Sequence, residues 1–254
     1  LVEEVLERQP EQIRSFLLQT AILDQFCSLL CNAVTAREDS REMLDILERS
    51  NLFLIPLDDQ RQWYRYHHLF AEVLQTHLAE RQAEQLSSLH LRASEWFERN
   101  GMRPDSIRHA LDAKDFERSA DLIELAGPTT EDGRIQQAAW LGWAKRLPEE
   151  LIRVRPVLNT WYAYALLGSG ELEAAEYRFE EAERWLEPTD MVKVQPGASP
   201  VQMVVTDKEQ FKALPATIAV GRAYIAQALG NIPDTVKYAS QVLDLMPEEE
   251  HFRR

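Results

Sequence analysis

The pattern of apolar positions identifies a β-hairpin in the first third of the chain. Leu52–Leu57 is an almost unbroken apolar run, and the aromatic-rich stretch Trp63–Tyr66 has the composition of a half-buried strand. The polar residues 58–62 between them suit a turn. Because Pro56 has no amide hydrogen to donate to a ladder, we expect its strand to lie at an edge.

The apolar spacing becomes helical directly after the hairpin. Apolar residues recur one helical turn apart at Leu69, Phe70, Val73, Leu74 and Leu78. The pair His67-His68 lies at the junction between strand and helix.

Three short helices are predicted before the hairpin. Their apolar positions are Ile13, Phe16, Leu17 and Leu23 in the first, Phe26, Leu29, Leu30 and Val34 in the second, and Leu44 and Leu47 in the third. Pro10 lies near the first turn of the first helix, and Asp39 or Ser40 can cap the third. Three helices, a hairpin and a fourth helix are the elements of a winged-helix domain.

The predicted third helix is acidic, whereas a DNA-reading winged helix places a neutral or basic helix in the major groove. Its acidic residues outnumber Arg41 and Arg49, and they are Glu38, Asp39, Glu42, Asp45 and Glu48. The whole chain carries a formal net charge of −14. Because phosphate contacts provide most non-specific affinity for DNA, we expect no direct nucleic-acid binding by this chain.

Turn residues and small residues recur at fixed offsets in the remainder of the chain. Residues 5, 9 and 12 positions after a turn residue are Ser106, Ala110 and Ala113 after Gly101, Ala175, Phe179 and Ala182 after Gly170, and Thr235, Ala239 and Val242 after Gly230. A poorer copy follows Lys114, with Ser119, Ile123 and Ala126. This pattern predicts helix pairs of the tetratricopeptide type, which stack into a superhelix. A non-repetitive helical bundle is the alternative.

These patterns predict a mainly α fold with two domains. We assign residues 1–84 to a winged-helix domain and residues 85–254 to a tetratricopeptide-like helical repeat region, with an irregular insertion near 189–207. The 254 residues suffice for about two domains. Since Leu1 stands in a helical pattern, we expect the chain to be a fragment of a longer protein.

Candidate chemistry is sparse. Cys27 and Cys31 lie one helical turn apart and supply half a zinc site, but we favour two buried apolar side chains and no metal. Unpaired thiols suit a reducing cytoplasm. The sequence has no phosphate-binding loop and no nucleophile elbow, so we expect no enzyme activity of its own. No apolar run reaches the ~18 residues of a membrane span, so we expect no membrane partner.

Four segments resemble MalT-like regulators of the LuxR family, which belong to the STAND class of signalling ATPases. They are FLLQTAILDQFCSLLCNAVT, LERSNLFLIPLDDQRQWYRYHHLFAEVL, SEWFERNGMRPDSIRHALDAKDFERSADLIE and LLGSGELEAAEYRFEEAE. In that family an ATPase domain precedes the winged helix, a helical-repeat sensor follows it, and a DNA-binding helix-turn-helix ends the chain. The resemblance implies that the complete protein binds ATP and ADP, although we expect no cofactor in this segment.

The resemblance also implies a role for His67. In related STAND proteins the winged helix ends in a Met-His-Asp-Leu motif whose histidine contacts a phosphate of bound ADP. The segment Tyr66-His67-His68-Leu69 matches that motif at His67 and Leu69 and departs from it at Tyr66 and His68. The alternative is that one histidine caps the helix while the other packs under the hairpin.

The helical repeats are the expected sensor. The first helix of each pair lines the concave face, which makes Trp161, Tyr164 and Tyr224 candidates for a ligand or partner surface. Packing between adjacent repeats is the alternative. The expected partners are the protein's own ATPase domain and a small-molecule inducer or regulatory protein, with self-association of the full-length protein possible. A second class of function is a helical-repeat scaffold for protein binding with no link to nucleotide.

Overall fold

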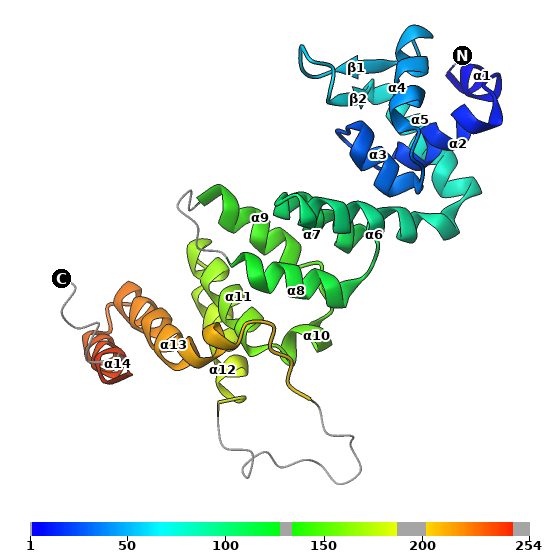
Figure 1. Cartoon of the computed structure of the whole chain (residues 1–254). Coiled ribbons are helices and arrows are strands. Elements are labelled where there is room, and N and C mark those ends of the chain that lie inside the picture. The colour runs from blue at the N-terminus through cyan, green and yellow to red at the C-terminus, as the bar shows by residue number, and fades with distance from the viewer. Residues whose placement is uncertain (1, 128–133, 187–201, 246–254) are drawn as a thin grey trace. The chain divides into compact units, whose positions relative to one another are not determined.

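The computed structural model describes residues 2–127, 134–186 and 202–245 (Figure 1). The chain packs as two compact units, Leu1–Asp115 and Phe116–Arg254, each of which is described by itself. Most of the expected insertion near 189–207 lies outside the described residues. Only residues 202–207 of it have a described structure.

The first unit has the elements of a winged helix in the predicted order. They are α1 (Val2–Glu7), α2 (Glu11–Thr20), α3 (Ser28–Thr35), α4 (Ser40–Arg49), β1 (Leu54–Pro56), β2 (Tyr64–Tyr66), α5 (His68–Arg81), α6 (Ala83–Arg99) and α7 (Arg103–Asp112). The three predicted helices correspond to α2, α3 and α4, and the helix after the hairpin is α5.

The hairpin forms as predicted, and its turn is closed by a side chain. β1 and β2 are antiparallel, and Leu54 pairs with Tyr66 while Pro56 pairs with Tyr64. In the turn the carboxylate of Asp58 accepts hydrogen bonds from the backbone amides of Gln62 (3.0 Å) and Trp63 (2.7 Å). On its other side β2 makes an isolated bridge to Phe26, so β1 is the edge strand, as expected from Pro56.

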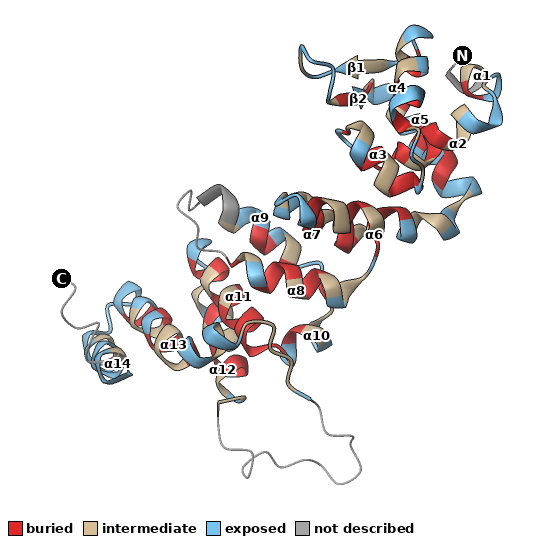
Figure 2. Ribbon diagram, viewed as in Figure 1, coloured by how far each residue is buried: buried red, intermediate tan, exposed pale blue. Residues whose placement is uncertain are grey.

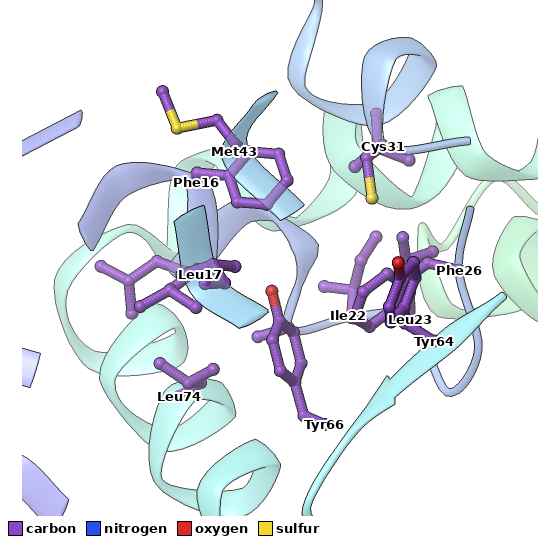
Figure 3. Close-up of a cluster of buried hydrophobic side chains, with 14 of the residues drawn as sticks. Phe16, Leu17, Ile22, Leu23, Phe26, Cys31, Met43, Tyr64, Tyr66 and Leu74 are labelled. Atoms are coloured by element: carbon purple, nitrogen blue, oxygen red, sulfur yellow. The ribbon is translucent and has the colours of Figure 1, made fainter. Parts of the chain in front are cut away.

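Two aromatic side chains attach the hairpin to the helices. Tyr64 and Tyr66 are buried and Arg65 between them is exposed, which is the alternation of a strand with one face on the core. The Tyr66 hydroxyl lies 2.7 Å from Thr20 Oγ1, and its ring lies 4.7 Å from that of Phe26. Figure 3 shows both tyrosines among the aliphatic and aromatic side chains of this cluster.

Two predicted helix ends differ from the structure. α2 ends at Thr20 and α3 begins at Ser28, so Leu23 and Phe26 are buried in the connection rather than in helices. The reason is the bridge to β2, because Phe26 exchanges two backbone hydrogen bonds with Tyr64 and this requires extended backbone. Asp39 occupies the N-cap position of α4, but its carboxylate binds Arg37 instead of capping the helix.

The hydrophobic core of the first unit continues into α6. Leu89, Ala93 and Phe97 belong to the same cluster as the residues of α2, α3 and α5. The predicted boundary between residues 84 and 85 therefore falls near the start of α6, whereas the chain divides by packing after Asp115.

The second unit is built from helices. They are α8 (Phe116–Ala126), α9 (Arg134–Ala144), α10 (Glu149–Arg153), α11 (Pro156–Gly168), α12 (Leu172–Glu183), α13 (Lys208–Ala228) and α14 (Ile232–Leu245). α11 packs against α12 and α13 pairs with α14, as antiparallel helical repeats do. The fold is therefore mainly α, with a winged helix followed by helical repeats.

The turn residues of the predicted repeats adopt the left-handed backbone region. Their φ angles are +73° at Gly101, +60° at Lys114, +81° at Gly170 and +70° at Gly230. Glycine adopts this region without strain and commonly ends helices there. The predicted turn positions are thus confirmed.

The residues at the predicted offsets are buried after Gly170 but not after Gly230. Ala175, Phe179 and Ala182 of α12 are all fully buried. Phe179 is the largest side chain at its offset, and it is accommodated because Gly221 of α13 faces it. A Cβ atom at Gly221 would lie 2.2 Å from the Phe179 ring. The last pair differs, since α14 has no buried residue (Figure 2).

An extended segment, residues 202–207, leads into α13 and is named here the strap. The backbone amide of Val204 donates to the carbonyl of Val154 (2.8 Å), and that of Thr206 donates to Glu124 Oε1 (2.9 Å). Arg155, which is 2% exposed, donates to Glu117 (2.8 Å), Asp121 (2.6 Å) and Thr206 Oγ1 (3.2 Å). The strap is thereby joined to α8 and to the start of α11.

Within the described residues, no helix is long and apolar enough to cross a membrane. The described side chains also include no group of three or more His, Cys, Asp or Glu residues placed to hold a metal ion. Cys27 and Cys31 are free thiols, and burial raises the pKa of Cys31 well above its usual value.

Candidate functional site

The backbone at the hairpin–helix junction is fixed on both sides of His67. The His67 amide donates to the carbonyl of Phe53 (2.8 Å). Its carbonyl accepts from the amides of Phe70 (2.9 Å) and Ala71 (3.0 Å), which begins the hydrogen-bond ladder of α5. His67 is therefore the N-cap residue of α5.

The aromatic residues Tyr66 and Phe70, on either side of His67 in the sequence, are buried. Tyr66 precedes His67 and is buried, and its burial raises the pKa of its hydroxyl far above the usual value. Phe70 is buried one turn into α5, with its ring 5.8 Å from Tyr66 and 5.0 Å from Phe53. Since the rings of Tyr66 and Phe70 are held in the core, the position of His67 is set by packing on both sides.

The two imidazoles lie at the surface. His67 is half-buried and His68 is exposed, and their ring centroids are 4.4 Å apart at 31°. Neither ring forms a hydrogen bond in the part of the chain that the structure describes, and His67 does not cap α5 with its side chain. His68 is exposed and therefore does not pack under the hairpin.

The electrostatic setting of the pair suits an anion. The first backbone amides of a helix lack intrahelical acceptors and carry the positive end of the helix dipole. The first turn of α5 contains no acidic residue. An imidazole N–H can add a further donor for an anionic oxygen. A phosphate or carboxylate could be bound there by His67 together with these amides.

α4 presents a different surface. Arg41 of α4 is paired with Asp45 at 3.6 Å, and Arg61 of the hairpin turn is paired with Glu48 of α4 at 2.6 Å. Such pairing leaves little free positive charge for phosphates.

The three aromatic residues predicted for a repeat surface fall into two environments. Trp161 and Tyr164 are half-buried on α11, and both donate hydrogen bonds to α13, Trp161 Nε1 to Gln210 Oε1 (2.7 Å) and the Tyr164 hydroxyl to the carbonyl of Thr217 (2.7 Å). Burial raises the pKa of Tyr164 to about 12. Tyr224 on α13 is 53% exposed.

The structure brings Trp161 and Tyr164 together, with ring centroids 6.0 Å apart, and records no ring contact of Tyr224 with either residue in the described chain. Both α11 residues contribute to the junction of adjacent helix pairs. Whether any of the three contacts a ligand stays a prediction.

The sequence patterns missed two buried polar groups. One is the Arg155 network around the strap, in which Glu124 is fully buried. Burial raises the pKa of Glu124, although the amides of Thr206 and Asp207 and the charge of Arg155 act in the opposite direction. The other is a histidine pair, His90 and His109, between α6 and α7. Both groups join residues far apart in sequence, and no local pattern marks them.

Comparison with known proteins shows what this chain is similar to. The family model for the MalT winged helix domain matches residues 2–86. The HTH-type transcriptional regulator MalT of Yersinia pestis is 26% identical over all 254 residues, which is 26% of that protein. MalT of Vibrio cholerae is 35% identical over 127 residues, or 50% of this chain and 14% of that protein.

A further relative has a different name. The serine/threonine-protein kinase PknK of Mycobacterium tuberculosis is 32% identical over 165 residues, which cover 65% of this chain and 15% of the kinase. The chain spans about a quarter or less of the length of these curated relatives. The family match covers α1 to α5 and the hairpin and ends at the start of α6, and the match to MalT of Yersinia pestis continues through the helical repeats. The chain is therefore similar to MalT, and its residues 2–86 match the winged helix domain of that regulator.

Proposed function

We propose that this segment transmits a signal within a MalT-like transcriptional regulator. Its winged helix would respond to the nucleotide state of an ATPase domain, and its repeats would bind an inducer or a regulatory protein. The observation that carries this proposal is the placement of His67, whose backbone is fixed by Phe53 and α5 while its ring forms no hydrogen bond in the described residues.

In this proposal His67 contacts a phosphate of ADP that is bound mainly by the ATPase domain. The imidazole and the first amides of α5 would stabilise the closed resting state, and the contact would be lost when the domains separate. The segment itself is proposed to be non-catalytic and to hold no cofactor. We place the protein in the cytoplasm, without direct nucleic-acid binding by this segment, and with self-association as a property of the complete regulator.

The test is His67→Ala in the complete regulator. A hydrogen bond to a charged group contributes about 1.5–3 kcal/mol, so ADP affinity should fall by roughly tenfold or more and basal transcription should rise. Equilibrium binding of ADP and a reporter assay without inducer measure the two effects. The thermal melt of this segment should not change, because the His67 ring forms no hydrogen bond in the described chain.

His68→Ala is the matched control. His68 is the neighbouring imidazole, and it is exposed at the surface of the same helix turn. We expect the control to retain ADP affinity and the low basal activity. Unchanged ADP affinity and unchanged basal transcription in His67→Ala would assign His67 a structural role only.

A protein-binding scaffold without a nucleotide link is the second candidate function. The observation that favours it is the number of exposed apolar side chains on the last helix pair, which include Val220, Ile232, Val236 and Leu243. If partner binding by the complete protein has the same affinity with ATP, with ADP and without nucleotide, the scaffold is the better description.

A further inference from the structure

Side-chain hydrogen bonds join α6 to α7 at three levels along their length. Ser87 Oγ donates to the carbonyl of Ala113 (2.8 Å), the Nδ1 atoms of His90 and His109 lie 2.8 Å apart, and Ser106 Oγ donates to the carbonyl of Ser94 (2.9 Å). Because the helices are antiparallel, these contacts form successive rungs of one polar ladder. The middle rung is the only one that can take up a proton near neutral pH.

The histidine pair is buried and held by packing. His109 is fully buried and His90 is 8% exposed, and their ring centroids are 5.0 Å apart. The His109 ring stacks on Phe97 at 5.3 Å and 12°. His109 Nε2 is buried and has no hydrogen-bond partner among the described residues. A hydrogen on that nitrogen would be a buried donor without an acceptor, which costs free energy. The cost is smaller if the nitrogen carries no hydrogen.

These observations determine which ring nitrogen carries the hydrogen in each neutral histidine. One Nδ1 must donate to the other, and a hydrogen on His109 Nε2 is disfavoured. His109 therefore carries its hydrogen on Nδ1 and donates to Nδ1 of His90, which carries its own hydrogen on Nε2.

An added proton cannot be accommodated in this arrangement. Three hydrogens would then occupy the four ring nitrogens. If the bare nitrogen is either Nδ1, the short bond survives, but His109 Nε2 carries a buried hydrogen without an acceptor. If the bare nitrogen is either Nε2, both Nδ1 atoms carry hydrogens that point at each other across 2.8 Å. Every protonated form also places a charge in a buried site.

The charged surroundings do not compensate for this cost. Burial lowers the pKa of both histidines, with Arg108 lowering it further, and the pKa of His109 falls to about 3. Asp112 opposes this effect at His90. α3, which packs on α6, contains no charged residue. The other titratable groups on α5 and α6 are His68, Glu72, His77, Glu80, Arg81, Glu84, Arg92, Glu95, Glu98 and Arg99, and on α7 they are Arg103 and Asp105.

We propose that the His90–His109 pair is a proton-sensitive clasp, which holds α7 against α6 at neutral pH and releases it on acidification. Released histidines become protonated in water, so the open form gains protons that the closed form excludes. The clasp belongs to the first unit and acts on its last helix pair, directly before the chain enters α8. It does not depend on the proposed nucleotide contact at His67.

The expected size of the effect follows from linkage. The folded pKa is depressed below the ordinary value of 6.5, so the stabilisation is present above pH 6.5 and is lost as the pH falls below it. Between pH 7.5 and 5.5 each excluded proton lowers the closed-to-open ratio about tenfold. For two histidines the loss is at most about a hundredfold.

The test follows hydrogen exchange of the α6 and α7 amides in the whole chain at pH 7.5 and 5.5, corrected for intrinsic exchange rates. The wild type should lose protection there by up to about a hundredfold. The variant His90→Leu/His109→Phe cannot titrate and should lose little. Ser106→Ala removes the neighbouring rung, so it should lower protection at both pH values and keep the wild-type pH dependence.

The tautomers provide a second measurement, on the wild-type chain, that does not depend on whether the double variant folds. Nitrogen chemical shifts should show the Nδ1–H form of His109 at pH 7.5, with both rings neutral until protection is lost. The proposal is overturned if either ring takes up a proton near pH 6.5 while α6 and α7 stay protected. It is also overturned if the double variant keeps the full pH dependence.

Discussion

Gly221→Ala tests the contact between neighbouring helix pairs. In a helix interior this change alone stabilises by roughly 0.8–1 kcal/mol, because alanine has the higher helix propensity. At Gly221, however, the new Cβ atom would lie 2.2 Å and 2.7 Å from atoms of the Phe179 ring. Phe179 is fully buried and packs edge-on against Tyr164 at 5.7 Å, so the ring cannot yield without moving α12 or α13.

Overpacking of a core costs about 1–3 kcal/mol, and the full burial of Phe179 places this case in the upper part of that range. We therefore expect a net loss of about 1–2 kcal/mol. At a urea m-value of about 2 kcal/mol/M, the midpoint should fall by roughly 0.5–1 M.

Gly142→Ala provides the matched control in the same unit. Gly142 lies in α9, and a Cβ atom there would meet nothing within 4 Å. The same substitution should then stabilise by about 0.5–1 kcal/mol. Urea titrations followed by circular dichroism measure both variants, and hydrogen exchange on α13 locates the effect.

A double variant separates the clash from a general weakening of α13. Phe179→Leu shortens the side chain that faces Gly221, so Gly221→Ala should cost less in the Phe179→Leu background than in the wild type. If Gly221→Ala is as stable as the wild type, or if its cost is the same in both backgrounds, the close approach of the two helices is not what determines this position.

Two further outcomes are expected. The chain should not shift duplex DNA at micromolar concentration and physiological salt, because the arginines beside α4 are paired with Asp45 and Glu48; a shift that weakens with added salt would contradict this. Trp161→Ala should cost about 2–3 kcal/mol in thermal melts, since the ring packs beside α13 and donates to Gln210, whereas Tyr224→Ala should stay within about 0.5 kcal/mol; equal losses would show that the two side chains are buried alike.

The parts of the fold that the sequence predicted correctly depend on local chemistry. The hairpin follows from alternating strand residues around an Asp58 turn, and the repeat turns follow from glycines such as Gly170 that adopt positive φ. The position of His67 is also local, because strand, N-cap and helix follow one another in the chain. Its predicted phosphate contact depends on a domain outside this chain, so no pattern within these residues can establish it.

The features that the sequence did not predict depend on contacts between distant residues. Phe26 left its predicted helix because a strand far along the chain pairs with it. The offsets around Phe179 suggested a position for small residues, but the small residue stands on the other helix, at Gly221. Trp161 could be recognised as an aromatic on a repeat helix, whereas its acceptor, Gln210, belongs to the next pair. Such pairs are visible only once the helices have been placed.

The strap changes how the second unit should respond to the deletion or exchange of helices. In a simple solenoid each repeat contacts only its neighbours, so stability is a sum of local terms and the ends fray independently. Here the amide of Thr206 binds Glu124 across 82 positions of sequence, and Arg155 joins both to α11. A deletion of α11 and α12 together with Arg155, the residue directly before α11, would therefore not shorten the array by one modular unit, because it would leave the buried carboxylate of Glu124 without its arginine. Segments of this protein should be exchanged with those of its relatives only as the whole stretch from α8 to the start of α13.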